Sequence, residues 1–152
     1  MSIFLSLGSN ISPRKKNIQR GLELLLFNGI DIISSSNFYK SKAMYIENQK
    51  NFFNKVIEVE TEKKPFELLL ALKLIEYKCK RNFLQERNGP RTLDIDILCY
   101  KKKIIKSKLL TIPHKSIHER KFILKPWSEI SPNYLIYGYR RSIKMLLNKI
   151  ES

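Results

Sequence analysis

Hydrophobic and polar positions at the start of the chain predict a strand followed by a helix. Residues 3–7 form a short apolar run that ends at the turn sequence Gly8-Ser9-Asn10, as expected of a strand. Ser12-Pro13 follows and is typical of a helix N-terminus, with Ser as the N-cap and Pro at the first helical position. Apolar residues then recur at helical spacing until Asn28-Gly29, which predicts the end of the helix.

Two further strands and a second helix are predicted next. Residues 30–38 are rich in β-branched side chains and indicate a strand. A third strand is expected at residues 52–62, where the alternation predicts a half-exposed strand with Val56 on the same side as two glutamates. A proline then begins a helix that covers residues 65–81, with apolar residues at helical spacing.

The C-terminal half contains one more strong strand signal and one clear helix. Residues 93–98 alternate between aliphatic and acidic side chains and predict the fourth strand. The chain that follows is interpreted as rich in loops, with a short helix near Ile117 and irregular structure over residues 122–130. An amphipathic pattern at residues 142–149 predicts the last helix.

The order β-α-β-β-α-β indicates an α+β fold with a ferredoxin-like βαββαβ core. Such a core has a mostly antiparallel sheet with helices packed on one face; here a loop-rich C-terminal extension and a final helix follow it. The chain has no internal repeat, low-complexity tract or Pro/Gly/Ser-rich linker. We therefore expect residues 1–152 to form a single domain, which at this length can bury a core without disulfides or metal.

Composition excludes several classes of protein. Hydrophobic residues make up 43% of the chain and charged residues 28%, as in soluble globular proteins. The sequence has no apolar run long enough to span a membrane, and its N-terminus lacks the features of a secretory signal. Two cysteines, Cys79 and Cys99, are too few for a disulfide framework or a zinc site. We expect a cytoplasmic monomer without a membrane partner.

The net charge of +15 has two possible explanations. A strongly basic chain often binds a polyanion, and a basic nucleic-acid-binding domain on a ferredoxin-like sheet would account for the charge. However, 21 of the 29 basic residues are Lys, and the chain also contains 20 Ile and 11 Asn. Because A/T-rich codons encode these three residue types, codon bias explains the charge without any nucleic acid. Carboxylates on the predicted fourth strand would also repel a nucleic-acid backbone.

The clearest candidate for chemistry is the pair Asp94 and Asp96, which are two of only three aspartates in the chain. In a strand, residues two apart point to the same face and lie about 6.5–7 Å apart. Leu93, Ile95 and Ile97 would then face the helices. Two carboxylates so close repel each other unless a cation neutralises them, and Mg²⁺ typically binds one or two carboxylates together with phosphate oxygens. The alternative is a solvent-facing polar stripe on an edge strand.

Cationic residues surround this pair in the sequence. Arg91 lies just before the strand, Arg81 ends the preceding helix, and His114 and Arg120 follow in the next segment. Arginine binds phosphate oxygens in a planar, bidentate manner, so carboxylates with several arginines and a histidine suit phosphoryl transfer. Ordinary structural explanations are also open: Arg81 could be a cation at a helix C-terminus, Arg91 could form a surface ion pair, and His114 could have its hydrogen bonds satisfied within a turn.

Other motifs restrict the kind of site. Neither a P-loop nor a GxGxxG loop is present, so a nucleotide would be held without them. His114 and His118 are four residues apart, but no acidic residue is suitably spaced and we do not interpret them as a metal pair. Asn54 offers donors and an acceptor that could recognise the edge of a heterocycle. Phe52 and Phe122 are equally consistent with core packing.

Taken together, motifs along nearly the whole chain resemble the 6-hydroxymethyl-7,8-dihydropterin pyrophosphokinase family of folate biosynthesis. The most specific is the segment from Gly89 to Leu98, which is close to the family signature GPRxLDxDIL. The other matches, in chain order, are Leu7-Gly8-Ser9-Asn10, Ser36 to Lys40, Phe52-Phe53-Asn54, Ile75-Glu76 with Arg81, Leu110 to His114, Arg120 with Phe122, and Pro126 to Pro132.

The resemblance implies transfer of pyrophosphate from ATP to the hydroxymethyl oxygen of the pterin, giving AMP and the pterin diphosphate. It implies two Mg²⁺ ions as cofactors and small-molecule substrates, with no nucleic acid. By position, the implied metal ligands are Asp94 and Asp96, and the implied catalytic residues are Arg81 and Arg91. The implied ATP-binding residues are Glu76, Ile97, Thr111, His114 and Arg120, and the implied pterin-binding residues are Phe52, Asn54 and Phe122.

The chain departs from the family pattern at several positions near the site. Lys73 stands for a usual Gln, Lys80 for a Gly, Phe83 for an Arg and Asn88 for an aromatic residue. We expect these departures to affect ligand affinity and the closure of a loop more than the reaction itself. A different Mg²⁺-dependent phosphoryl or nucleotidyl transferase is therefore a second alternative, beside the nucleic-acid-binding domain.

Overall fold

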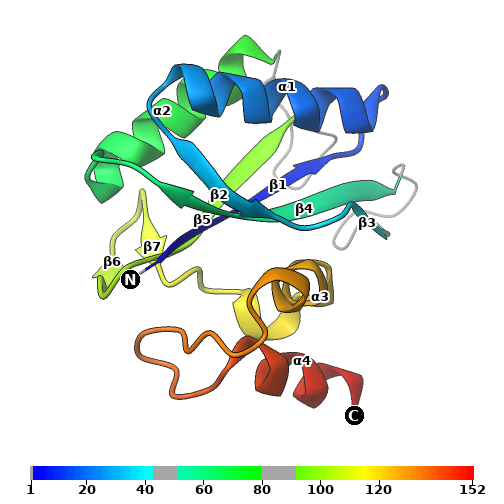
Figure 1. The fold of residues 1–152 in the computed structure, drawn as a ribbon, viewed down its shortest axis with the longest axis vertical. Coiled ribbons are helices and arrows are strands. Elements are labelled where there is room, and N and C mark those ends of the chain that lie inside the picture. The colour runs from blue at the N-terminus through cyan, green and yellow to red at the C-terminus, as the bar shows by residue number, and fades with distance from the viewer. Residues whose placement is uncertain (1, 43–50, 80–91) are drawn as a thin grey trace.

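The computed structural model describes residues 2–42, 51–79 and 92–152, which form a main sheet with helices on both faces and a separate two-stranded sheet (Figure 1). In chain order, the elements are β1 (Ile3–Ser9), α1 (Arg14–Phe27), β2 (Asp31–Ser35), β3 (Tyr39–Ser41), β4 (Phe52–Glu60), α2 (Pro65–Lys78), β5 (Asp94–Tyr100), β6 (Ile105–Lys106), β7 (Thr111–Ile112), a 3₁₀ helix (Ile117–Glu119), α3 (Lys121–Ile130) and α4 (Ile143–Glu151).

The main sheet has five strands in the order β2-β4-β1-β5, with β3 also pairing with β4. Every pairing is antiparallel, which confirms the prediction of an α+β fold with a mostly antiparallel sheet. The finer ferredoxin-like assignment stays a prediction. The register places Gly8 of β1 opposite both Asn54 of β4 and Asp94 of β5, so three predicted motifs meet at one end of the sheet.

Helices α1 and α2 cover one face of the sheet and bury the first core. Leu5 and Leu7 of β1 point into this core together with Ile18 of α1 and Leu72 of α2. Alternate residues of a strand reach the same face, which is why every second residue of β1 belongs here. Gly21 leaves room for the side chain of Leu93, the residue before β5, because a Cβ at this position would lie only 2.8 Å from Leu93 Cδ2.

The opposite face of the sheet is also covered, which corrects the expectation of helices on one face. Phe4, Val56 and Leu98 project from the sheet into a second core formed with α3 and α4 (Figure 1). Val56 is fully buried there, so the half-exposed pattern predicted for its strand was wrong at this position. The side chains that these helices contribute are Ile123, Leu124, Trp127, Ile143, Leu146 and Leu147.

Helix α3 was predicted as irregular structure, and the structure shows a ten-residue helix with Pro126 inside it. A proline removes a backbone donor and usually ends a helix, which is why the sequence favoured a loop. Burial of Ile123, Leu124 and Trp127 against the sheet outweighs this preference.

Two predicted elements have different bounds in the structure. The strand expected at residues 30–38 ends earlier, at Ser35, and the separate strand β3 follows beside β4. Helix α2 ends at Lys78 rather than near Arg81, which lies outside the described residues. Within the described ranges, no helix is long and apolar enough to cross a membrane.

Candidate functional site

Asp94 and Asp96 lie on β5, an edge strand of the sheet, and share the face that α3 covers. Their strand neighbours Leu93, Ile95 and Ile97 are buried in the first core, as predicted from the alternation. Leu98, which continues the aspartate side of the strand, packs in the second core. The aspartates therefore line the space between the sheet and the C-terminal part of the chain, not the core under α1 and α2.

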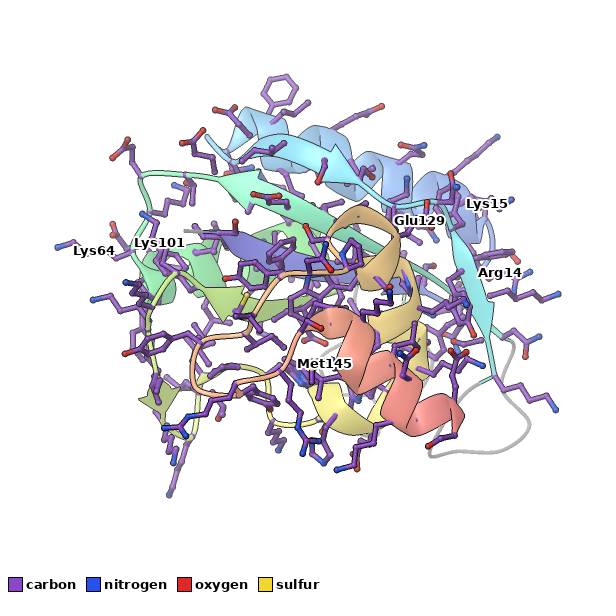
Figure 2. All side chains as sticks on the ribbon, turned by 60° about the horizontal axis from the view of Figure 1, so that its bottom comes forward. Arg14, Lys15, Lys64, Lys101, Glu129 and Met145 are labelled. Atoms are coloured by element: carbon purple, nitrogen blue, oxygen red, sulfur yellow. The ribbon has the colours of Figure 1, made fainter. Side chains whose placement is uncertain are left out.

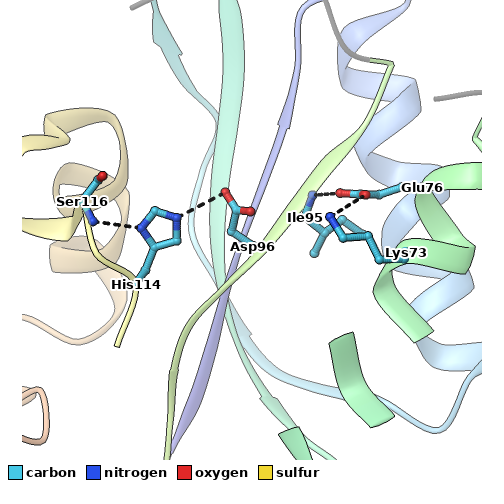
Figure 3. A network of polar contacts seen from close by, with 6 residues as sticks. All are labelled: Lys73, Glu76, Ile95, Asp96, His114 and Ser116. Carbon is cyan, nitrogen blue, oxygen red and sulfur yellow. Dashed lines mark hydrogen bonds and ion pairs between the residues drawn. The ribbon is translucent and has the colours of Figure 1, made fainter. Parts of the chain in front are cut away.

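His114 faces Asp96 across this space, with 3.9 Å between Nε2 of His114 and Oδ2 of Asp96 (Figure 3). The backbone holds the ring in place, because the N–H of His114 donates to the carbonyl of Leu98 at 2.9 Å. The ring Nδ1 accepts a hydrogen bond from the N–H of Ser116 at 3.2 Å. Nδ1 is thus an acceptor, and in the neutral ring the proton is on Nε2, which points toward Asp96.

The pKa of His114 is lowered to about 4, mainly by burial and in part by the charges of Arg120 and Lys115, against the opposing effect of Asp94. The imidazole is therefore neutral at physiological pH. A neutral Nε2–H can donate to an anionic oxygen that enters the space between His114 and Asp96.

Asp96 has the most strongly shifted carboxyl group of the site. The pKa of Asp96 is raised to about 7, mainly by burial and in part by the charges of Asp94 and Glu76, while the charges of Arg120 and Lys73 oppose the rise. The side chain nevertheless keeps 31% of its surface exposed and lines an open cavity. A desolvated carboxylate beside a second one is the arrangement that a bound cation stabilises, so the donor set fits Mg²⁺.

The described residues place no third His, Cys, Asp or Glu side chain with the two aspartates so as to hold such a cation. Across residues 2–42, 51–79 and 92–152, no three His, Cys, Asp or Glu side chains are grouped so as to hold a metal ion. A cation bound by two carboxylates would therefore complete its coordination with water and substrate oxygens, as Mg²⁺ commonly does.

Glu76 links α2 to the backbone of β5 at Ile95, the residue between Asp94 and Asp96 in the sequence (Figure 3). Its side chain is fully buried, and Oε2 accepts a hydrogen bond from the N–H of Ile95 at 2.7 Å. Nζ of Lys73 lies 3.6 Å from Oε1 and offsets the buried charge. The predicted contact of Glu76 with a nucleotide stays a prediction. The sequence analysis missed the hydrogen bond between Glu76 and Ile95, because nineteen residues separate the two and no local pattern indicates the bond.

A cavity of about 260 Å³ extends from the Asp96 and His114 pair. Two other residues predicted to contact nucleotide, Ile97 and Thr111, line the same cavity. Sequence reasoning missed most of its remaining wall, which comes from α2 and from the chain around β7. These lining residues are Leu69, Lys73, Ile95, Lys108, Leu109, Leu110 and Lys115.

Arg120 and Phe122 lie at the beginning of α3, close to the same space. The guanidinium carbon of Arg120 is 5.7 Å from the centre of the Phe122 ring. The charge of Arg120 lowers the pKa of both Asp96 and His114, so the cation contributes to the field at both groups. The structure thus brings Arg120 into the electrostatic environment of the aspartate pair, as the sequence predicted.

Asn54 and Phe52 meet at Gly8, on the neighbouring strands of the sheet. Asn54 is buried, and its Nδ2 donates to Oγ of Ser41 in β3 at 2.8 Å. A Cβ at Gly8 would lie 2.9 Å from Oδ1 of Asn54 and 3.5 Å from Cδ1 of Phe52. Gly8 therefore leaves room for both predicted pterin-binding side chains of β4, a role that the turn-like sequence around it does not reveal.

We expect Gly8→Ala to weaken pterin binding, because its Cβ would displace the Asn54 amide. The KM for the pterin should rise about tenfold, the change expected from losing roughly 1.4 kcal/mol of binding. Steady-state kinetics measures this, with the melting temperature recorded in parallel. Gly8→Ala should also lower the melting temperature, and if the clash with Asn54 causes this loss, the loss should disappear when Gly8→Ala is made in an Asn54→Ala background. Losses of melting temperature that simply add in the double variant would contradict the clash.

Arg81 and Arg91, the predicted catalytic residues, lie outside the described residues. The departures at Lys80, Phe83 and Asn88 lie outside them as well. The placement of these five side chains thus stays a prediction.

Comparison with known proteins places this fold and site in context. A family model described as 7,8-dihydro-6-hydroxymethylpterin-pyrophosphokinase (HPPK) matches residues 4–132. The chain is 41% identical over 145 residues to the 2-amino-4-hydroxy-6-hydroxymethyldihydropteridine pyrophosphokinase of Aquifex aeolicus, a match that covers 94% of this chain and 88% of that protein. The enzyme of the same name from Haemophilus influenzae is 35% identical to this chain over 137 residues, a match that covers 90% of this chain and 85% of that enzyme.

Several relatives are much longer proteins. The chain is 42% identical over 130 residues to folic acid synthesis protein fol1 of Pneumocystis carinii, but spans only 17% of it. The crystal structure of Plasmodium falciparum HPPK-DHPS with pteroate superimposes with a TM-score of 0.78 at 18% identity, over 97% of this chain and 42% of that one. At this identity the likeness shows the fold alone.

Proposed function

Because the chain belongs to the 7,8-dihydro-6-hydroxymethylpterin-pyrophosphokinase family, we propose that it transfers pyrophosphate from ATP to 6-hydroxymethyl-7,8-dihydropterin. The observation that carries the proposal is Asp96 of β5, which shares a strand face with Asp94, facing a neutral His114 in the wall of a cavity. The pterin hydroxymethyl oxygen would attack the β-phosphorus of ATP, and the bond from that phosphorus to the α,β-bridging oxygen would break. AMP and the pterin diphosphate are the products, and the hydroxyl proton is lost to solvent.

The cavity beside Asp96 is the proposed nucleotide site. Its apolar part, which includes Ile97, suits a base, while Thr111 adds a hydroxyl and Glu76 supports the strand from behind. His114 and Arg120 would bind triphosphate oxygens through Nε2–H and the guanidinium. Arg81 and Arg91 would act on the phosphoryl group in transfer, where charge builds up in the transition state. The lysines of the cavity wall add positive charge that favours a polyanionic ligand.

Asp94 and Asp96 would hold Mg²⁺, and we propose two ions. Bound there, the ions would neutralise charge on the triphosphate oxygens and align attacking and leaving oxygens. The raised pKa of Asp96 and its proximity to Asp94 support this assignment, because a bound cation would favour the charged form of Asp96.

Phe52 and Phe122 would enclose the pterin ring, and Asn54 would bind its polar edge. Ser41 fixes the Asn54 amide, since it accepts a hydrogen bond from Nδ2 and leaves Oδ1 and one amide proton for the ligand. Ser41 is thus a positioning residue for the pterin site.

We expect Ser41→Ala to raise the KM for the pterin about fivefold while leaving kcat nearly unchanged. A single hydrogen bond contributes roughly 1 kcal/mol, and it acts here on ligand orientation. Steady-state kinetics with varied pterin measures the effect, and Ser41→Thr, which keeps the hydroxyl, should behave like the wild type. Equal losses in the Ala and Thr variants would show that the hydroxyl is irrelevant.

The direct test of the proposed function is incubation of the protein with ATP, Mg²⁺ and 6-hydroxymethyl-7,8-dihydropterin, followed by separation of the nucleotides. AMP should appear in equal amount to the pterin diphosphate, and neither should form without the pterin. Formation of ADP and free phosphate instead would contradict pyrophosphoryl transfer. Nothing in the comparisons favours the nucleic-acid-binding alternative, because the family model and the relatives from Aquifex aeolicus and Haemophilus influenzae are pyrophosphokinases.

We also propose that residues 1–152 act as one domain in the cytoplasm. The packing of α4 against α3 in the second core supports a single domain, because it joins a helix beyond the residues that the family model matches to the rest of the fold. Cys79 and Cys99 are free and buried, which supports a reducing compartment.

A further inference from the structure

Helix α1 begins with three basic residues, Arg14, Lys15 and Lys16, and its first turn contains no acidic residue. This is the reverse of the usual pattern, because the partial positive charge at a helix N-terminus favours acidic side chains and disfavours cations. Lys15 and Lys16 are exposed, whereas Arg14 is half-buried. A half-buried cation at the unfavourable end of a helix indicates a role toward another part of the chain.

Arg14 makes two contacts at the beginning of β4. Its Nη1 donates a hydrogen bond to the backbone carbonyl of Asn51, the residue before the strand, at 2.7 Å. Its guanidinium carbon lies 4.5 Å from the centre of the Phe53 ring. A hydrogen bond from a charged donor is stronger than one between neutral groups, and a guanidinium over an aromatic ring adds a cation–π attraction. The two contacts therefore hold the start of β4 against the first turn of α1.

Phe53 lies between the two predicted pterin-binding residues of β4 but points to the opposite face of the sheet. Its ring packs against the first core, on the side that α1 covers. Successive residues of a strand point to opposite faces, so Phe52 and Asn54 point away from α1. A Cβ at Gly8 would approach both of these side chains, which shows that they share one face. Arg14 thus holds the strand from behind, at the residue between them.

The first turn of α1 is itself fixed to the end of β1. Nδ2 of Asn17 donates to the carbonyl of Ile11 at 2.8 Å, and the N–H of Asn17 donates to the carbonyl of Pro13 at 2.9 Å. Oγ of Ser9, the last residue of β1, also donates to the carbonyl of Ile11, at 3.3 Å. Because these bonds fix the base of the Arg14 side chain, its contacts align the start of β4 with the end of β1.

We propose that Arg14 is a positioning residue for the pterin, which holds the beginning of β4 so that Phe52 and Asn54 meet the ring in the correct orientation. This inference rests on the proposed function, since it takes the pterin as the ligand of these two side chains. Without Arg14, pterin binding would have to order this end of β4, and that cost would lower the affinity. Nucleotide binding should not change, because α2, β5 and the chain around β7 line the proposed nucleotide cavity.

Lys15 provides a matched control, because it is a second cation in the same helical turn and over the same ring. Its Nζ lies 5.0 Å from the centre of the Phe53 ring. Arg14 and Lys15 lie together at one edge of the molecule (Figure 2). Removing Lys15 relieves the same unfavourable charge at the helix end but leaves the hydrogen bond to Asn51 in place. A difference between the two variants therefore reports the contacts of Arg14 and not the change in net charge.

Calorimetric titration with 6-hydroxymethyl-7,8-dihydropterin tests the proposal, in the presence of Mg²⁺ and α,β-methylene-ATP, which cannot be cleaved at the bond that would break. Arg14→Ala should raise the Kd for the pterin about tenfold, the order of magnitude expected for the loss of a charged hydrogen bond. Its Kd for the ATP analogue should stay close to the wild-type value, and Lys15→Ala should change neither. Equal pterin affinity in the two variants, or a parallel loss of pterin and nucleotide affinity in Arg14→Ala, would overturn the proposal.

Amide hydrogen exchange of the ligand-free protein tests the positioning without the pterin. The backbone amides of residues 52–54 should exchange at least about fivefold faster in Arg14→Ala than in Lys15→Ala, because local opening of this strand end becomes easier. The amide of Val59, near the other end of β4, should exchange equally in both variants. Equal exchange at residues 52–54 would overturn the proposal. A wild type that binds no pterin but shows this difference in exchange would instead refute the proposed function and leave Arg14 as the residue that holds β4.

Discussion

Asp96→Asn should abolish activity and at the same time make the metal-free protein slightly more stable. The substitution keeps the shape of the side chain but removes half of the carboxylate pair that would hold Mg²⁺. Loss of a charge that stabilises the transition state through bound metal should lower kcat by at least about a hundredfold. The amount of AMP formed measures this loss, and Asp94→Asn should show the same behaviour.

The expected gain in stability follows from the electrostatics of the metal-free site. Burial raises the pKa of Asp96, and the charges of Asp94 and Glu76 add to the effect, so that the pKa moves from 3.8 to about 7. The folded protein therefore binds a proton that the unfolded chain releases between these values, so its stability falls as pH rises through this window. Asparagine removes this cost, and the variant should melt higher above pH 7. Relief on the order of 1 kcal/mol corresponds to about 2–4 °C in Tm.

Asp31→Asn is the matched control for both measurements. Asp31 is the third aspartate of the chain and lies exposed on β2, away from β5. It should change neither the rate nor the stability, since an exposed carboxylate has little interaction to lose. An active Asp96→Asn enzyme would end the metal assignment. An inactive variant that melts lower than wild type would instead indicate that Asp96 holds the fold together.

Trp127→Ala should produce the largest loss of stability in the molecule. Trp127 is fully buried in the second core, with its ring centre 5.0 Å from that of Phe4. Truncating a buried aromatic residue costs about 3–5 kcal/mol, because it removes buried apolar surface and leaves a cavity. At about 2–4 °C per kcal/mol, thermal unfolding should shift down by roughly 6–20 °C.

Trp127→Phe distinguishes packing from hydrogen bonding as the role of this residue. Nε1 of Trp127 is buried without a hydrogen-bond partner among the described residues. Phenylalanine therefore loses volume but no hydrogen bond, and its loss of Tm should be less than half that of alanine. If Phe destabilised the protein as much as Ala, an interaction of the indole nitrogen would have to account for most of the effect.

The sequence by itself determined the elements whose signals are local. The first strand and helix were predicted because an apolar run and an Asn-Gly end lie within thirty residues of one another. The predicted start of the helix was wrong, because the helix begins at Arg14 with Pro13, not Ser12, at the N-cap. The common face of Asp94 and Asp96 followed from the two-residue period of a strand, and the structure confirms it through the burial of Leu93, Ile95 and Ile97. Motif order along the chain also sufficed to identify the family.

Only the tertiary structure decided which surfaces those elements bury and which partners the polar side chains find. Helix α3 forms despite Pro126, because the second face of the sheet buries its apolar side, and no local pattern reports that distant surface. The contact of Glu76 with Ile95 and the space that Gly8 leaves for Asn54 likewise join residues far apart in the chain. Periodicity fixes the direction of a side chain relative to its own element, whereas burial and hydrogen bonding depend on what the rest of the chain brings to that side.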